Sequence, residues 1–444
     1  MSELFKPGDL VGLEPSGQTC RIEEFLGGGG QGEVYSARYG ERAWALKWYY
    51  PQSATQGQRK ALEKLIDIKI KSYNFPSPEF LWPEFMASRL GFPGYGYLMP
   101  LRERRFHGIV DILNQQVDPS FRSLVNAGIK LADSFLLLHS KGLCYCDISF
   151  GNVFFDPETG DIMICDNDNV GVDGENNSGV LGTPRFMAPE VVTGKSKPNI
   201  QTDLYSLAVL LFYMFFLHHP LEGRFEADIQ CMDLAAMQKL YGKDAKFIFD
   251  PDDESNRPVP GLHDNALTFW PLYPQFLRDI FIRAFTSGIK DAKDGRVRES
   301  EWRAALSKLR DLIYYCPQCG AENFVHEGPN PLDTVPESVC WGCGCELTVP
   351  FRLCVGRQTV VLNQDTKIFT HHVDPRKRND FSTPVAELAQ HPVRPDVWGL
   401  KNLSTAKWTT LGPNGKQLEV PPGRSVSIAY NTRIHFGTSE GVIV

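Results

Sequence analysis

One group of polar residues at fixed spacing constrains this chain more than any other feature. The segment Tyr145–Asn152 reads YCDISFGN and places Asp147 and Asn152 five residues apart. Fourteen residues beyond Asn152, the apolar run Ile162–Cys165 ends at Asp166. An Asp, an Asn and a second Asp that follow a helix and a strand in this order are far more specific than any one of them alone.

A glycine-rich segment lies between two strand-like runs nearer the N-terminus. Leu26–Val34 reads LGGGGQGEV and contains G-x-G-x-x-G-x-V. Glycines let backbone N–H groups approach phosphate oxygens without a Cβ in the way, although the same run also fits a flexible turn. Thirteen residues after Val34, a strand pattern ends at Lys47. This lysine could reach phosphates if a carboxylate holds it, and the candidate is Glu63 in the next predicted helix.

Hydrophobic periodicity predicts the main elements. Strands are expected within residues 20–50, and helices over residues 56–72, 120–141, 203–217 and 299–314. The 203–217 helix is apolar on all sides and too short to cross a bilayer, which indicates a helix buried in protein. After residue 346 short Val-, Ile- and Thr-rich runs indicate β structure.

Further motifs follow Asp166. Residues 182–190 read GTPRFMAPE, and Asp203 opens the apolar helix. In this order and spacing, these motifs resemble the eukaryotic-type protein kinases, specifically the Ser/Thr branch, over roughly residues 18–313. The resemblance implies a multidomain α+β chain with a bilobal kinase fold: a β-rich N-lobe over residues 1–103 and a helical C-lobe over residues 104–313. It also implies the activity of a Ser/Thr protein kinase.

The resemblance assigns roles to individual residues. Asp147 would orient the substrate hydroxyl and accept its proton, and Thr183 would shape the peptide site. Lys47 would pair with Glu63. Asn152 and Asp166 would hold Mg²⁺ across the phosphates of ATP. The residues that would cover the phosphates or line the adenine site are Gly27, Gly29, Gly32, Val34, Ala45, Lys47, Met99, Leu101 and Phe154.

Two other acids are expected to be structural. Glu190 should form a buried ion pair with Arg296, and Asp203 should cap the backbone of the catalytic loop. A buried charge is costly unless it has a partner. The Ala188-Pro189-Glu190 triplet, with Thr183, also argues against a third interpretation, a kinase for small molecules.

One departure from the family pattern bears on regulation. Cys146 stands where activation-dependent kinases have an arginine, and Ser178 is the one hydroxyl residue between Asp166 and Thr183. Without that guanidinium, a phosphate on this segment has no obvious partner. We therefore expect activity without phosphorylation of the segment.

Two other departures bear on the rate. Ser149 replaces a lysine that contacts the γ-phosphate, and Asp166-Asn167-Asp168 replaces Asp-Phe-Gly. They leave room for an alternative interpretation, a nucleotide-binding pseudokinase scaffold that recruits partners through its C-terminal domains.

Five cysteines are concentrated between residues 316 and 345. Cys316-Pro-Gln-Cys319-Gly and Cys340-Trp-Gly-Cys343-Gly both have the form C-x-x-C-G, with twenty residues between Cys319 and Cys340. Two such turns can present four thiolates to a structural Zn²⁺. Residues 314–350 thus resemble a zinc ribbon, with Cys345 as a competitor for the fourth ligand.

Residues 351–444 resemble a forkhead-associated β-sandwich in their succession of strands and turns. The expected phosphothreonine-binding residues are not recognisable in order, since Gly356-Arg357 comes too early. We expect a docking module for a partner protein, with phosphopeptide recognition as the alternative. The pair His371-His372 and the run Arg376-Lys377-Arg378 could bind an anion.

Net charge, cysteine content and one further motif limit the partners and the cellular compartment that we expect. The net charge of −7 argues against a dedicated nucleic-acid binder, and no signal sequence or bilayer-spanning stretch is recognisable. Eleven cysteines, an odd number with a paired cluster, suit a reducing compartment and therefore a cytoplasmic protein. The motif His219–Gly223 and the cysteine knuckles are similar to bacterial signalling kinases that accompany a phosphatase and a von Willebrand A-like protein. This similarity implies those two proteins as partners, the latter as substrate.

Overall fold

The computed structural model of the chain describes residues 3–444 except 72–74, 176–179, 329–331, 333–337, 378, 392, 395–396 and 413–414. The chain forms two compact units. The first comprises Met1–Pro119, Lys130–Leu267 and Ile280–Ser300, and the second comprises Ser120–Ile129, Thr268–Asp279 and Glu301–Val444. The segments expected to form the N-lobe and most of the C-lobe fall in the first unit, and those expected to form the ribbon and the sandwich fall in the second.

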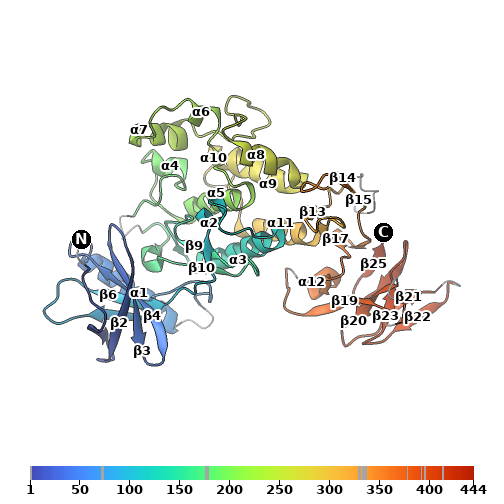
Figure 1. Ribbon diagram of the computed structural model, residues 1–444, viewed down its shortest axis with the longest axis horizontal. Helices are drawn as coiled ribbons and strands as arrows, with labels where there is room; N and C mark the ends of the chain where they lie inside the picture. Colours follow the sequence, from blue (N-terminus) through green and yellow to red (C-terminus); the bar gives the residue numbers. More distant parts are fainter. Residues whose placement is uncertain are drawn as a thin grey trace. The chain divides into compact units, whose positions relative to one another are not determined.

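The first unit begins with six antiparallel strands that close into a barrel in the order β1-β2-β3-β4-β6-β5 (Figure 1). These strands are β1 (Leu10–Glu14), β2 (Thr19–Gly28), β3 (Gly32–Tyr39), β4 (Arg42–Tyr49), β5 (Phe85–Ser88) and β6 (Gly96–Pro100). On β4, Leu46 and Trp48 face the barrel core, where Trp48 packs edge-to-face on Phe5. Because side chains alternate along a strand, Lys47 lies on the opposite face, which it shares with Ala45 and Tyr49.

Helix α1 (Gln56–Lys71) packs beside the barrel (Figure 1). Its buried side chains are Leu62 and Leu65, and the backbone carbonyl of Leu65 accepts a hydrogen bond of 3.0 Å from the Trp82 indole N–H. Its polar residues form ion pairs along the exposed face, such as Lys71 with Asp67. The helix is therefore amphipathic, as the sequence predicts for residues 56–72.

The helical part of the first unit centres on α5 (Ile200–Phe216). Every α5 side chain from Thr202 to Phe216 is buried, and the Asn199 side chain accepts a hydrogen bond of 3.2 Å from Thr202 N at the N-cap. The uniformly apolar sequence thus forms a core helix. The other helices described up to residue 311 are α2 (Ile109–Leu113), α3 (Phe121–Ser140), η1 (Asn167–Asn169), α4 (Pro189–Val192), α6 (Arg224–Ala227), α7 (Leu234–Gln238), η2 (Lys239–Lys243), α8 (Asp264–Phe269), η3 (Trp270–Leu272), α9 (Gln275–Phe285), α10 (Ser287–Lys290) and α11 (Glu299–Asp311).

Short strands position the polar residues that the sequence singles out. β7 (His107–Gly108), β9 (Val153–Phe155) and β10 (Ile162–Ile164) form one small sheet, and β8 (Leu143–Cys144) pairs with β11 (Gly171–Val172). Asp147 and Asn152 lie in the loop between β8 and β9. Asp166 follows β10 and precedes the 3-10 helix η1 (Asn167–Asn169).

The second unit contains two short hairpins that carry the cysteine knuckles. β12 (Ile313–Tyr315) pairs with β13 (Glu322–Phe324), and β14 (Ser338–Val339) pairs with β15 (Glu346–Leu347). Tyr314, Val325 and Leu347 bury their side chains together with Cys316 and Cys340. This cluster is small, as expected for so short a segment.

The remainder of the second unit is built from two antiparallel sheets, one of six strands and one of four. Side chains from both sheets share one hydrophobic core around Trp408, and a single helical turn, α12 (Thr370–Val373), follows β18. The strands, in the order in which they pair, are β17 (Gln358–Val361), β16 (Arg352–Val355), β25 (Glu440–Ile443), β24 (Arg433–His435), β21 (Trp408–Leu411) and β22 (Gln417–Val420) in the larger sheet and β18 (Lys367–Phe369), β19 (Pro384–Gln390), β20 (Trp398–Asn402) and β23 (Ser425–Ser427) in the smaller.

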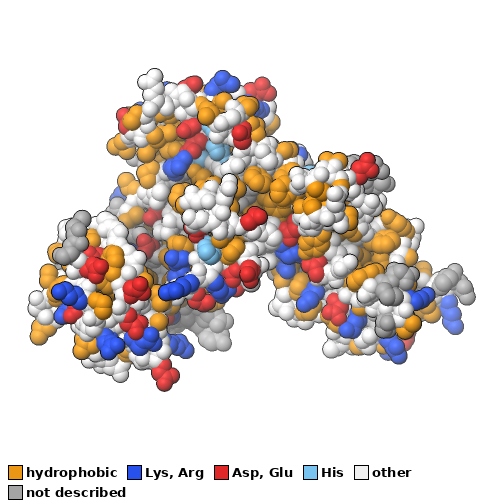
Figure 2. Space-filling model, in the orientation of Figure 1, with side chains coloured by type: hydrophobic (Ala, Val, Ile, Leu, Met, Phe, Trp, Pro, Cys, Tyr) orange, Lys and Arg blue, Asp and Glu red, His pale blue; other side chains and the backbone are white. Residues whose placement is uncertain are grey.

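Among the described residues, no helix has the length and apolar character needed to cross a bilayer. Lys and Arg side chains are interspersed with Asp and Glu on the face of the barrel shown in Figure 2.

Candidate active site

Asp147 is held by two side chains from different segments. Thr183 Oγ1 donates a hydrogen bond of 2.8 Å to Asp147 Oδ1, and Asn152 Nδ2 donates one of 3.2 Å to Oδ2 and one of 2.9 Å to the Asp147 carbonyl. Burial raises the pKa of Asp147 above its usual value, and the donated hydrogen bonds act against that rise. The structure thus brings together three of the predicted site residues, around a carboxylate suited to accept a proton.

The backbone before Asp147 is fixed by Asp203. Asp203 Oδ2 accepts a hydrogen bond of 2.5 Å from Tyr145 N, and Oδ1 accepts one of 3.0 Å from Cys146 N. His139 Nε2 lies 3.1 Å from Asp203 Oδ2, and its Nδ1 contacts the carboxylate of Glu299. The expected capping role of Asp203 is confirmed.

The expected ion pair between Glu190 and Arg296 is also confirmed. Arg296 Nη2 lies 2.9 Å from both carboxylate oxygens of Glu190. Sequence reasoning missed a second ion pair in this region: Arg185 Nε donates to Glu222 Oε1 at 2.9 Å, and Tyr241 OH donates to the same atom at 2.6 Å. The sequence feature that could have indicated this ion pair is Glu222, the acid in the motif His219–Gly223.

Lys47 is a buried cation with two carboxylate partners. Its Nζ lies 2.9 Å from Asp168 Oδ2 and 3.3 Å from Asp166 Oδ1. Burial acts to lower the pKa of Lys47, but the charges of Asp168 and Asp166 outweigh it and raise the pKa above its usual value. The structure therefore brings Lys47 and Asp166 together as expected, and adds Asp168.

The expected pairing of Lys47 with Glu63 is wrong for this structure. Glu63 Oε1 instead contacts Arg59 Nε at 3.0 Å, and its side chain is 49% exposed. Glu63 is the expected partner because it is the first acid after Lys47 along the chain. The direction of its side chain, however, depends on which face of α1 is buried. Leu62 and Leu65 define that face, and the mixed periodicity of this helix did not specify it.

The residues expected to line the adenine site gather mainly in one hydrophobic cluster. Ala45 pairs with Met99 across β4 and β6, and Val34 and Leu101 pack against the same cluster. Phe154, expected to lie beneath the adenine, is on β9 with the Arg102 guanidinium carbon 4.0 Å from its ring centroid. Arg102 was not anticipated.

The glycines between β2 and β3 divide into two kinds. A Cβ on Gly32 would lie 2.1 Å from the carbonyl oxygen of Trp48, so only glycine fits there. At Gly27 and Gly29 a Cβ would meet no described atom within 4 Å. Gly32 is therefore required by packing, while the open faces of Gly27 and Gly29 fit the approach of a phosphate.

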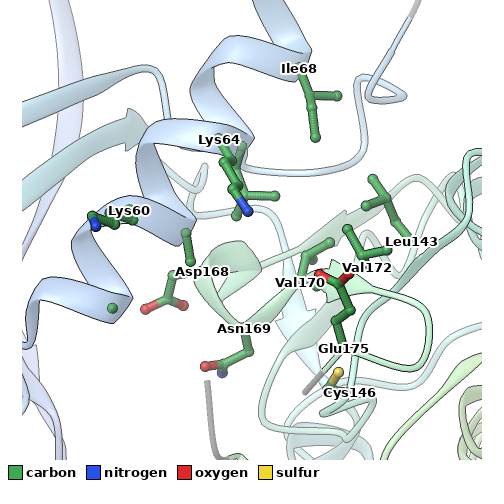
Figure 3. A pocket seen from close by; sticks show the side chains of 14 residues that line it. Lys60, Lys64, Ile68, Leu143, Cys146, Asp168, Asn169, Val170, Val172 and Glu175 are labelled. Carbon is green, nitrogen blue, oxygen red and sulfur yellow. The ribbon is translucent and has the colours of Figure 1, made fainter. Parts of the chain in front are cut away.

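A cavity of about 330 Å³ lies between helix α1 and the segment that follows Asp166 (Figure 3). Lys60 and Lys64 come from the helix side, and Asp168 and Asn169 come from the opposite side. Most of its wall is apolar. The other residues that line it are Gly57, Ala61, Leu65, Ile68, Leu143, Cys146, Val170, Gly171, Val172 and Glu175.

Four cysteines of the two knuckles converge. The sulfur atoms of Cys316, Cys319, Cys340 and Cys343 all lie within 4.8 Å of one another. The Gly residues that end the knuckles, at positions 320 and 344, have φ of +75° and +72°, as tight turns require. A hydrogen bond from the backbone N–H of Cys319 is the main reason why the pKa of the Cys316 thiol is lowered to about 6. The cluster is compatible with zinc, which binds thiolates.

Cys345 lies beside this cluster, with its sulfur 3.3 Å from that of Cys316. Distance alone therefore does not separate it from Cys343, whose sulfur is 3.7 Å from the same atom.

The candidate anion-binding residues of the last domain are engaged in structural contacts. His372 Nδ1 accepts a hydrogen bond of 2.9 Å from Phe369 N, so the neutral ring carries its proton on Nε2, which lies 3.0 Å from Asp311 Oδ2. His371 Nδ1 contacts the Asp380 carbonyl at 2.8 Å. Arg376 pairs with Asp374, and Arg378 lies outside the described residues.

Comparison with known proteins identifies a protein kinase domain. Residues 107–272 match the protein kinase domain family. Similar proteins include protein kinase MCK1 of Saccharomyces cerevisiae, 31% identical over 133 residues (29% of this chain and 34% of that protein). Another is the serine/threonine-protein kinase plk-2 of Caenorhabditis elegans, 29% identical over 102 residues (21% and 15%). The protein kinase C delta type of Mus musculus is 34% identical over 96 residues (21% and 14%).

The matches cover a minor part of each of these three relatives, between 14% and 34% of its length. Asp147, Asn152, Asp166 and Thr183 all lie within residues 107–272, the region that matches the family. Lys47 and the glycine-rich turn precede that region, so their assignment depends on the geometry described above.

The network around His139 yields a testable prediction about stability. Burial acts to lower the pKa of His139, but hydrogen bonds to Asp203 and Glu299 outweigh it and raise the pKa to about 9. A folded-state pKa above the unfolded value of about 6.5 gives stability that is complete below pH ~6.5 and is lost as pH rises through about 9. Urea unfolding should show this loss, up to about 3 kcal/mol, in the wild type and not in His139→Gln.

The exposed His435 provides the control. His435→Gln should retain the wild-type dependence of unfolding free energy on pH. The same pH dependence in wild type and His139→Gln would contradict the assignment of a charged His139.

Proposed function

We propose that the chain is a Ser/Thr protein kinase that transfers the γ-phosphoryl group of Mg-ATP to a hydroxyl of a partner protein. The observation that carries this proposal is that two groups of contacting side chains lie on linked segments of the chain. Asp147 with its donors Asn152 and Thr183 forms the first, and Lys47 with Asp166 forms the second. Tyr145 OH donates to the Cys165 carbonyl and so links the two segments.

The donor set fits Mg²⁺. Asn152 directs its Nδ2 to Asp147, so its Oδ1 is not used in those bonds. The Asp166 carboxylate is 41% exposed although Lys47 contacts one of its oxygens. Hard oxygen ligands of this kind suit Mg²⁺, which would neutralise charge across the phosphates of bound ATP.

The protein's own groups would act by position and charge. Asp147, with its raised pKa, would accept the proton of the substrate hydroxyl, and Thr183 would keep Oδ1 oriented. The buried ammonium of Lys47 would bind the α- and β-phosphates. Because phosphoryl transfer requires positioning and charge neutralisation, these groups suffice for the chemistry proposed.

Activity is proposed to be independent of phosphorylation in the segment between Asp166 and Thr183. Cys146 is buried, its sulfur lies 3.4 Å from that of Cys144, and it offers no cation to a phosphate. Ser178, the segment's hydroxyl residue, lies outside the described residues.

The second unit is proposed to hold a structural Zn²⁺ and to recruit a partner protein in the cytoplasm. Zinc is supported by the convergence of the four cysteines, with Cys343 preferred over Cys345 because it keeps the C-x-x-C-G spacing. Recruitment by a forkhead-associated-like domain is supported by the two sheets with a common core. The proposed partners are a von Willebrand A-like substrate and a cognate phosphatase.

Transfer of radiolabelled phosphate from ATP to protein tests the catalytic proposal. Asp147→Asn and Asp166→Asn should each reduce transfer by ~100-fold or more, because one removes the proton acceptor and the other a proposed Mg²⁺ ligand. Asp118→Asn changes an exposed acid in the same unit and should leave the rate unchanged. Wild-type protein that binds ATP but transfers no phosphate to any protein would favour the pseudokinase scaffold instead.

Phosphatase treatment tests the independence from phosphorylation. Wild-type protein dephosphorylated to completion, as verified by mass spectrometry, should keep its full rate, because Cys146 cannot bind a phosphate as an arginine would. Ser178→Ala should behave in the same way. Abolition of activity by dephosphorylation or by the Ser178→Ala substitution would contradict this part of the proposal.

Metal analysis tests the zinc proposal. The purified chain should contain one zinc per molecule, and Cys319→Ser and Cys343→Ser should lose it and lower the thermal stability of the second unit. Cys345→Ser is the matched control and should retain the metal. Retention by Cys343→Ser together with loss in Cys345→Ser would mean that Cys345 is the fourth ligand.

A further inference from the structure

Resting on the proposed kinase function, we propose that Asp168 is the positioning residue of Lys47, and that helix α1 contributes no carboxylate to this pair. The sequence motifs assign no role to Asp168, which occupies the third position of the Asp166-Asn167-Asp168 motif.

The contacts of Asp168 are those of a fixed anchor. Its Oδ2 lies 2.9 Å from Lys47 Nζ and also accepts a hydrogen bond from Tyr49 OH. Gln58 Nε2 donates a hydrogen bond of 3.0 Å to the Asp168 backbone carbonyl. The side chain is fully buried and that of Lys47 is 7% exposed. A buried ion pair with such added hydrogen bonds has a defined geometry, unlike an exposed pair of two long side chains.

Helix α1 cannot supply the carboxylate in its present orientation. The structure describes all of its residues, and its acids are Glu63 and Asp67, which pair with Arg59 and Lys71 on the exposed face. Gln58 marks the face that meets Asp168. At about 100° per residue, Glu63 lies about 140° around the helix from Gln58.

The inward position one turn after Gln58 is held by Leu62, which is fully buried. Sliding α1 towards the barrel would therefore not bring Glu63 to Lys47. The helix would have to rotate about its axis and expose Leu62 to water, which loses hydrophobic stabilisation.

The placement of Asp168 joins two functions in one element. Asp166 and Asp168 flank Asn167 at the start of η1, and both contact Lys47. The proposed Mg²⁺ ligand and the anchor of the phosphate-binding lysine therefore move together. Helix α1 borders the same segment across the cavity in Figure 3. Its hydrogen bond to Asp168 comes from an amide, Gln58, which donates to the Asp168 backbone carbonyl.

Two matched substitutions test the proposal by kinetics. Asp168→Asn should lower kcat/KM for ATP by ~100-fold, because Lys47 loses its closest charge partner. Glu63→Gln should remain within about twofold of wild type, because Glu63 is half exposed and pairs with Arg59 rather than with Lys47. A large loss in Glu63→Gln with a small one in Asp168→Asn would overturn the proposal.

A second readout is independent of catalysis. The rate at which Lys47 is acetylated by acetic anhydride, followed by peptide mass spectrometry in the absence of nucleotide, reports the pKa of its ammonium group. The midpoint should shift to lower pH in Asp168→Asn and stay at the wild-type value in Glu63→Gln. Asp168→Glu, which keeps the charge, should restore most of the wild-type midpoint, whereas a purely structural role would not depend on charge.

The kinetic measurement and the Lys47 titration distinguish a failure of the proposed function from a failure of the proposed role of Asp168. Wild-type protein without phosphotransfer would refute the proposed function, while the Lys47 titration would still decide the role of Asp168. If Asp168→Asn does not fold, as judged by circular dichroism, Asp168→Glu and Glu63→Gln decide instead. A Lys47 midpoint that shifts in Glu63→Gln, or that is the same in wild type and a folded Asp168→Asn, would overturn the proposal.

Discussion

The carboxylate of Asp203 is the constraint on which the candidate site depends. It lies in the first turn of the buried helix α5, accepts hydrogen bonds from the backbone N–H groups of Tyr145 and Cys146, and contacts the imidazole of His139. Because those N–H groups immediately precede Asp147, the rigidity of the core helix is transmitted to the catalytic loop. A carboxylate buried here is acceptable because three donors satisfy it.

The helices and barrel strands could be predicted from periodicity because their burial is regular. Strands within residues 20–50 and the helices α1, α3, α5 and α11 lie where the pattern placed them, within a few residues at their ends. The two-sheet arrangement after residue 350 could not be derived in the same way. Its strands are short and pair over long sequence distances, as β16 does with β25, and local pattern does not encode such pairing.

The site shows the same contrast between spacing and direction. Asp147, Asn152 and Thr183 could be identified because motifs with fixed spacing carry them. Glu63 was misassigned because an acid in the right part of a helix says nothing about the face on which it lies. Asp168 went unrecognised because the sequence showed only that a Phe-Gly pair was missing, not that the new acid would turn towards Lys47.

These two errors have one physical cause. A buried lysine requires a negative partner, because an unpaired ammonium in a site of low polarity would lose its proton or unfold its surroundings. Once α1 turns its acids outward, that requirement must be met from another segment within reach of Lys47. Asp168, two residues after Asp166, meets it, at the place where a glycine would leave the lysine with a single, half-exposed carboxylate. The outward direction of the helix acids and the inward direction of Asp168 are therefore two parts of one arrangement.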